Sequence, residues 1–188
     1  MTNFFRVAVL ACVLISHLPT LAVAQTELLK PDRLIEAIIS NNYDLAKSTL
    51  IRGHDPDPVD SYRRTAIILA AMAGNADLVE LLAKYKAKLD ARDEAGGSAL
   101  QYAAARGHVD VVELLLDLGA RIDIENRQGM TPLMRAAADG RVEIVELLLG
   151  RKADAARNDY TGRTALMWAQ RYRRKNIVRI MRRAGIRE

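Results

Sequence analysis

One pattern of apolar and polar positions recurs along the chain at an interval of 33 residues. A hydroxyl residue opens each stretch, an alanine lies five positions later, a valine lies fourteen positions later, and two mainly leucine columns follow. The four opening residues are Thr65, Ser98, Thr131 and Thr164. A period of this length predicts a stack of small supersecondary units, which usually bind partners rather than catalyse reactions.

Within each unit the apolar spacing predicts two short helices. In the fourth unit, Thr131 can cap a helix N-terminus and Pro132 can take the first helical position, where a missing N–H group costs nothing. We therefore expect a first helix from about 132 to 139. Gly140 can end this helix, and apolar residues from Val142 onward recur at helical spacing and predict a second helix. Each unit should be a helical hairpin.

The frame can be extended backward from Thr65 to a fainter first unit that begins near Asp32. Ser48 and Thr49 replace the paired leucines there. Because one unit cannot bury its own apolar face, neighbouring units must cover each other's leucines. The first unit is therefore expected to be either a polar N-terminal cap or a loosely docked pair of helices.

These residues resemble the ankyrin repeat family, whose unit has the pattern D-x-x-G-x-T-P-L-H-x-A-A-x-x-G-H-x-x-[VI]-V-x-x-L-L-x-x-G-A-x-x-N. Residues 126–154 and 93–123 match it most fully, although its proline survives only as Pro132. The histidine column of the family holds Ile68, Gln101, Met134 and Met167. The resemblance implies an all-α solenoid of stacked helix-turn-helix units, joined by short β-hairpins or loops. It implies one domain over residues 25–188, with units at about 27–59, 60–92, 93–125, 126–158 and 159–188.

The first 24 residues are typical of a signal peptide. Arg6 precedes an apolar run from Val7 to Leu18, and Ala22 and Ala24 form a small-residue cleavage site. This run is too short to span a bilayer comfortably. We therefore expect cleavage after Ala24 and a periplasmic or secreted protein, with bacterial export favoured.

Cys12 is the only cysteine of the chain, and the residues before it loosely resemble a bacterial lipoprotein cleavage box. Lipidation at Cys12 is the alternative to cleavage after Ala24. If Cys12 is removed with the leader, the mature chain can form no disulfide, and its stability must come from packing.

Positive charge is concentrated at the C-terminal end. Residues 163–188 hold nine Lys or Arg against one acid, whereas residues 25–162 hold eighteen against twenty-two. One interpretation is a polar cap for the last unit, whose outer face has no neighbour. The other is a cationic surface for an anionic membrane or another polyanion, formed by Arg173, Arg174, Lys175, Arg182 and Arg183. Nucleic acid is not an expected partner, because the leader directs the chain away from it.

No arrangement of residues indicates catalysis. After the leader the chain has two histidines and no cysteine. His108 occupies a repeat column, which indicates a structural role, and the acids near His54 lack the spacing of a helix-loop-helix calcium site. One turn position of each unit carries an acid or amide, as local Asx turns require: Asp60, Asp93, Asn126 and Asp159. We expect no enzymatic activity, no cofactor and no metal.

The resemblance implies that a partner protein binds to the tips of the hairpins and to the inner face of the first helices. The residues expected to contact it vary between units: Tyr62, Arg64, Met72, Glu94, Arg106, Arg127, Gln128, Met130, Tyr160, Arg163, Arg171 and Tyr172. Tyr, Arg and Met are enriched at protein interfaces. Met167 and Trp168 are expected to pack within the terminal unit instead. The expected function is a monomeric, non-enzymatic protein-binding scaffold.

Overall fold

The computed structural model describes residues 32–187, and within this range the chain forms ten helices and no strand. The helices follow one another as five pairs. These are α3 (Arg33–Ile39) with α4 (Tyr43–Ile51), α5 (Ala66–Ala73) with α6 (Ala76–Lys84), α7 (Ala99–Arg106) with α8 (Val109–Asp117), α9 (Pro132–Asp139) with α10 (Val142–Gly150), and α11 (Ala165–Arg171) with α12 (Lys175–Arg183). The prediction of an all-α stack of helix pairs is confirmed. The expected leader and Cys12 lie outside the described residues.

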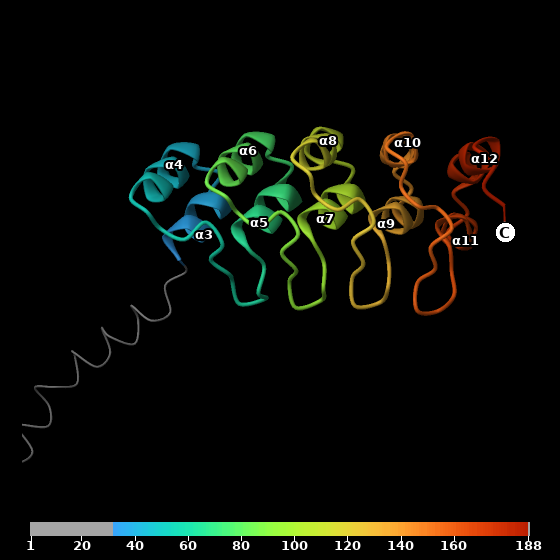
Figure 1. Ribbon diagram of the computed structural model, residues 1–188, viewed down its shortest axis with the longest axis horizontal. Coiled ribbons are helices and arrows are strands. Elements are labelled where there is room, and N and C mark those ends of the chain that lie inside the picture. Colours follow the sequence, from blue (N-terminus) through green and yellow to red (C-terminus); the bar gives the residue numbers. More distant parts are fainter. Residues whose placement is uncertain (1–31, 188) are drawn as a thin grey trace, which may run out of the picture. The chain divides into compact units, whose positions relative to one another are not determined.

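The helix pairs stack in two layers (Figure 1). The first helices, from α3 to α11, pack against one another in one layer, and the second helices, from α4 to α12, form the other. Loops that join one pair to the next project beyond the layer of first helices (Figure 1). We call residues 60–64, 93–97, 126–130 and 159–163 the tip loops. Near the first of them, an isolated antiparallel bridge joins Val59 and Thr65.

The leucine columns form a core that continues from unit to unit. Leu82, Leu115 and Leu148 occupy one column and are each 0% exposed. The first unit has Thr49 in this column, also 0% exposed, and its hydroxyl donates a hydrogen bond of 2.7 Å to the Leu45 carbonyl. Because the buried hydroxyl has a partner, the substitution leaves no unsatisfied group. The first unit is a packed helix pair, not a loosely docked one.

The hydroxyl residues that open the units cap their first helices in three of four cases. The Thr131 hydroxyl accepts a hydrogen bond from the Met134 N–H, as the prediction required, and Ser98 and Thr164 act in the same way. Thr65 differs, because its buried hydroxyl has no hydrogen-bond partner. Among the described residues it is the one buried side-chain polar atom in this condition.

This difference predicts unequal effects of the same substitution at two caps. Thr131→Val should lower the free energy of unfolding by about 1 kcal/mol, because it removes a cap. Thr65→Val should be close to neutral or stabilising. It puts a methyl group of similar size in place of a hydroxyl that has no hydrogen-bond partner. Urea unfolding of both variants measures the two values. Equal losses of unfolding free energy in the two variants would contradict the conclusion that Thr131 caps its helix and Thr65 does not.

Candidate partner-binding surface

Each tip loop is built on the acid or amide of the repeated turn position. The Asp60 carboxylate accepts hydrogen bonds of 2.9 Å from the N–H groups of Tyr62 and Arg64. Asn126 and Asp159 accept the equivalent pair of backbone hydrogen bonds, and Asp93 accepts one of 2.8 Å from Gly97. The prediction of local Asx turns is confirmed at Asp60, Asn126 and Asp159, whereas Asp93 binds only the N–H four residues later. These four side chains hold the backbone of the tip loops in shape.

The same hydrogen bonds control ionisation. Burial raises the pKa of Asp60 and of Asp159, but the hydrogen bonds that each carboxylate accepts outweigh burial, so that both pKa values lie below the ordinary value. Both groups therefore stabilise the folded chain above the ordinary pKa of a carboxyl, and this contribution is lost as pH falls through the lowered value. Burial and the hydrogen bond to Asp93 raise the pKa of Tyr102 to about 12.

Consecutive tip loops are joined through their backbones. The Glu94 N–H donates to the Tyr62 carbonyl at 3.2 Å, the Arg127 N–H to the Ala95 carbonyl at 3.3 Å, and the Tyr160 N–H to the Gln128 carbonyl at 3.0 Å. Such close approach requires glycine at position 129, where a Cβ would lie 2.6 Å from the Tyr160 ring and 2.9 Å from its backbone nitrogen. The tips are therefore held as one row.

Gly129 and Gly162 provide a matched test of this close approach. Their φ angles are 76° and 77°, but a Cβ at position 162 would meet nothing within 4 Å. Gly162→Ala should cost about 1 kcal/mol through backbone strain alone. Gly129→Ala should cost clearly more, because the added methyl group also displaces Tyr160. Thermal unfolding compares them, and similar midpoints would show that the tips are not in contact.

A second row of contacts lies at the opposite end of the first helices. Arg141 Nε donates to the Ala105 carbonyl at 2.8 Å, and Arg174 Nε donates to the Ala138 carbonyl at 2.9 Å, each 36 residues earlier. His108 Nε2 lies 3.2 Å from the Met72 carbonyl in the equivalent position. These carbonyls belong to the last turns of the preceding first helices, where a cation is favoured. His108 thus has the structural role that its column indicated, and Arg174 connects two units.

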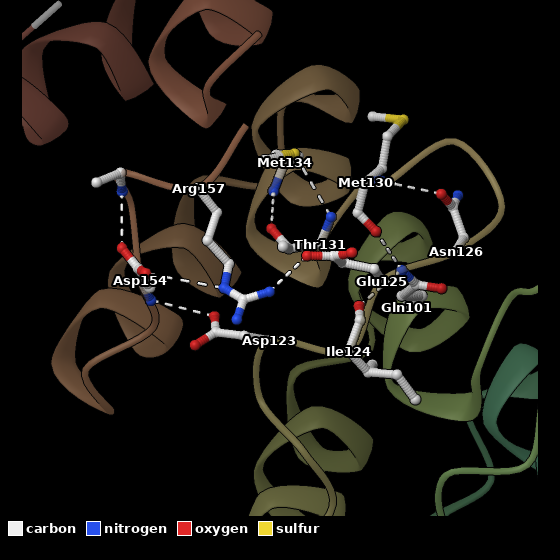
Figure 2. A network of polar contacts seen from close by, with 11 residues as sticks. Gln101, Asp123, Ile124, Glu125, Asn126, Met130, Thr131, Met134, Asp154 and Arg157 are labelled. Atoms are coloured by element: carbon white, nitrogen blue, oxygen red, sulfur yellow. Dashed lines mark hydrogen bonds and ion pairs between the residues drawn. The ribbon is translucent and has the colours of Figure 1, made fainter. Parts of the chain in front are cut away.

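Buried and exposed polar contacts also join the units (Figure 2). Gln101 donates through Nε2 to the carbonyls of Ile124, at 3.0 Å, and Met130, at 2.6 Å. It thereby ties α7 to the next tip loop from the column where the family has histidine. Nearby, the Asp123 carboxylate accepts a hydrogen bond of 3.1 Å from the Asp154 N–H, and Arg157 pairs with Glu125 (Figure 2).

The structure places most of the expected contact residues on the surface, and we call the exposed part of the tip loops and first helices the inner surface. The exposed ones are Tyr62, Glu94, Arg106, Arg127, Gln128, Tyr160, Arg171 and Tyr172, and the half-buried ones are Arg64, Met72 and Arg163. Three of the arginines already form hydrogen bonds or ion pairs within the chain. Arg64 pairs with Asp60 at 2.6 Å, Arg106 donates to the Met72 carbonyl at 2.8 Å, and Arg163 donates to the Thr161 hydroxyl at 2.6 Å.

Met130 is the one residue of the predicted contact set that the structure buries. It was expected at an exposed tip, but it is 8% exposed and belongs to the core cluster. Its N–H group is bound by Asn126 and its carbonyl by Gln101, so the turn directs the residue inward. Met130 therefore stabilises the tip loop and is not available to a partner.

A group of aromatic and arginine side chains on the inner surface surrounds Trp168 on α11. Its ring stacks on Tyr172, with centroids 5.8 Å apart and planes inclined by 12°. The guanidinium groups of Arg163 and Arg171 lie 5.4 Å and 5.9 Å from the indole centroid. The indole N–H donates to the second carboxylate oxygen of Asp159 at 2.9 Å. We call these residues the Trp168 cluster: Arg163, Trp168, Arg171 and Tyr172.

Arg163, Arg171 and Tyr172 were predicted as contact residues, whereas Trp168 was predicted to pack within the terminal unit. Trp168 does pack against the core, but its ring also brings the other three side chains together, which the sequence did not predict. A signal was present, because Trp168 lies nine positions after its turn acid, as Tyr102 lies nine positions after Asp93. In both units the aromatic side chain donates to the turn carboxylate and is thereby held in place. The aromatic residue is oriented by a hydrogen bond as well as by packing.

Within residues 32–187, no group of three or more His, Cys, Asp or Glu side chains is arranged to hold a metal ion. None of the helices in this range combines the length and apolar character that crossing a membrane requires.

The chain matches the model of a known protein family. The model described as ankyrin repeats (3 copies) matches residues 34–126 and 118–187. Together the two matches extend over all five helix pairs.

Proposed function

The chain belongs to the ankyrin repeat family, whose members generally bind other proteins, and we propose that it is a non-enzymatic scaffold that binds a partner protein after export from the cytoplasm. It acts as a monomer, and the partner contacts the inner surface. The family is typically non-enzymatic. The lowered pKa values of Asp60 and Asp159 are accounted for by turn hydrogen bonds and do not require a catalytic role.

The Trp168 cluster is the observation that carries this proposal. Tryptophan, tyrosine and arginine are the residue types that contribute most to protein interfaces, because they offer a large contact area at a low cost in conformational entropy. In the cluster these side chains already restrain one another by stacking and by cation–π contact. Tyr160, in the adjoining tip loop, is 73% exposed and extends the same surface.

Rigidity of the tips supports the same function. Association loses free energy when loops and side chains must be ordered at the interface. Here the tip loops are fixed by Asx turns, by hydrogen bonds between neighbouring tips and by the buried Gln101 bridge. A partner therefore meets a surface that is already ordered, and more of the contact energy remains for affinity.

Export rests on the first 24 residues and on cysteine usage. The leader has the basic start, short apolar run and small-residue site of a signal peptide. Residues 25–188 contain no cysteine, which avoids mispairing in an oxidising compartment. The intact mass of the exported protein should correspond to a chain that begins at Gln25. A mass for a chain lipidated at Cys12, or for an uncleaved chain, would contradict this expectation.

Affinity capture from an extracytoplasmic extract tests the function, with two matched double variants as bait. Arg127→Ala/Tyr172→Ala removes exposed side chains from the inner surface, and Arg52→Ala/Tyr43→Ala removes the same types from exposed positions at α4. The partner protein captured by the unmodified chain should be retained by the α4 variant and reduced about tenfold or more by the inner-surface variant. Equal recovery with both variants would refute the assignment of the surface.

A further inference from the structure

The last unit ends in a groove that the binding surface above does not include. It has a volume of about 700 Å³, and five cations line it: Arg173, Lys175, Arg179, Arg182 and Arg183. Val178 lies among them. This valine is half-buried, whereas the valines of the same column in the three preceding units, Val79, Val112 and Val145, are 0% exposed. The groove, which we call the C-terminal groove, is therefore where a further unit would pack.

Two of the cations stand where inner units have apolar residues. Lys175 occupies the column of Val109 and Val142, and Arg182 occupies the column of Leu116 and Leu149. In the inner units these apolar side chains pack against the core. Polar side chains suit such positions in α12, because Lys175 and Arg182 are exposed among the described residues. Solubility alone does not require that all of them carry the same charge.

The uniform charge lowers stability in ways that a mixed cap would avoid. Like charges three or four residues apart on a helix repel each other, and α12 contains such pairs in Lys175–Arg179, Arg179–Arg182 and Arg179–Arg183. A cation in the first turn, such as Lys175, also opposes the helix dipole. Residues 160–187 contain no Asp or Glu. Within the described part of the chain, none of the five lining cations forms an ion pair.

Arg173 adds a backbone cost to the electrostatic one. Its φ is 56°, in the left-handed region, at the column where the three preceding units have Gly74, Gly107 and Gly140. Glycine adopts this conformation without strain, whereas arginine does not. Arg173 therefore carries its charge into the lining of the groove at a cost in backbone strain. The unpaired cations of one sign favour an acidic ligand, because they repel one another when nothing neutralises them.

We propose that the C-terminal groove binds an amphipathic helix of a partner protein, with its apolar side on Val178 and acidic residues on both flanks. Lys175, Val178, Arg179 and Arg182 fall at positions i, i+3, i+4 and i+7 of α12, which is the spacing of a helix face that packs against another helix. Each second helix already packs on the next, as α10 does on α12. The partner helix continues this layer, and its carboxylates pair with the five cations.

A membrane surface fits the groove less well. The apolar residues of α12 that face the core, Ile177 and Met181, are 1% and 0% exposed. Among the described residues, no large exposed hydrophobic side chain lies beyond Tyr172. The last helix therefore offers no apolar wedge for insertion between lipids, and a bilayer would leave the Val178 floor uncovered.

The test uses a labelled synthetic peptide of about 18 residues, or five helical turns. Leucines form one stripe of this peptide at helical spacing, and glutamates flank the stripe. A second peptide has the same composition in scrambled order. Fluorescence anisotropy with the purified protein gives the Kd of each. The variants are Arg179→Gln/Arg182→Gln in the groove and, as a control, Lys84→Gln/Lys88→Gln at exposed positions elsewhere.

The amphipathic peptide should bind the unmodified protein and the lysine control with the same Kd, and added salt should weaken both complexes. The groove variant should raise the Kd about tenfold or more, while its thermal midpoint stays the same or rises because repulsion is removed. Equal affinity for the scrambled peptide would overturn the proposal, because charge alone would then account for binding. It would also be overturned if the groove variant bound the peptide unchanged, or if the protein bound phosphatidylglycerol vesicles but not the peptide.

The proposed roles of the C-terminal groove and of the inner surface are tested independently. Capture of a partner that depends on Arg127 and Tyr172 concerns the inner surface alone. Peptide binding that depends on Arg179 and Arg182 concerns the groove alone.

Discussion

Each unit of this chain depends on its neighbours, because two short helices cannot bury the apolar face that they share. Leu82, Leu115 and Leu148 are fully buried by packing that extends across unit boundaries. The first and last units show the same constraint, because each has a neighbour on only one side among the described residues. Thr49 takes the leucine position in the first unit and satisfies its own hydroxyl, and Val178 in the last unit remains partly exposed. The stack is therefore one cooperative body whose ends need special side chains.

Apolar packing alone does not set how one unit sits on the next, because leucine contacts tolerate small displacements. Directional hydrogen bonds supply that information. Arg141 and Arg174 each reach the last turn of the preceding first helix, Gln101 joins α7 to the following tip loop, and the tips bond to one another through their backbones. These contacts are made by residues that also lie next to the inner surface. The features that fix the stack therefore also hold the binding residues in place.

Much of this fold could be predicted from the sequence, because the residues that begin and end its helices act locally. The hydroxyl, proline and glycine of the fourth unit predicted a first helix at 132–139, which is where α9 lies. The turn acids followed from the same local chemistry. The binding surface was less predictable, because exposure depends on contacts between units. Met130 is drawn inward by a glutamine 29 residues away, and Arg174 reaches a carbonyl 36 residues away. The Trp168 cluster could not be predicted in the same way, because its four side chains come from a tip loop and a helix and meet only in the folded unit.

The central claim is that the units share one continuous core, and unfolding of a Leu115→Ala variant tests it most directly. Trp168 is the only tryptophan and lies in the last unit, whereas Leu115 lies in α8, two units earlier. The substitution should lower the free energy of unfolding by about 2 to 5 kcal/mol, as cavities in packed cores do, and Glu113→Ala should have little effect. The transition seen by Trp168 fluorescence should shift together with the loss of helical circular dichroism. A Trp168 transition that stays unchanged while part of the helix content is lost would contradict the account.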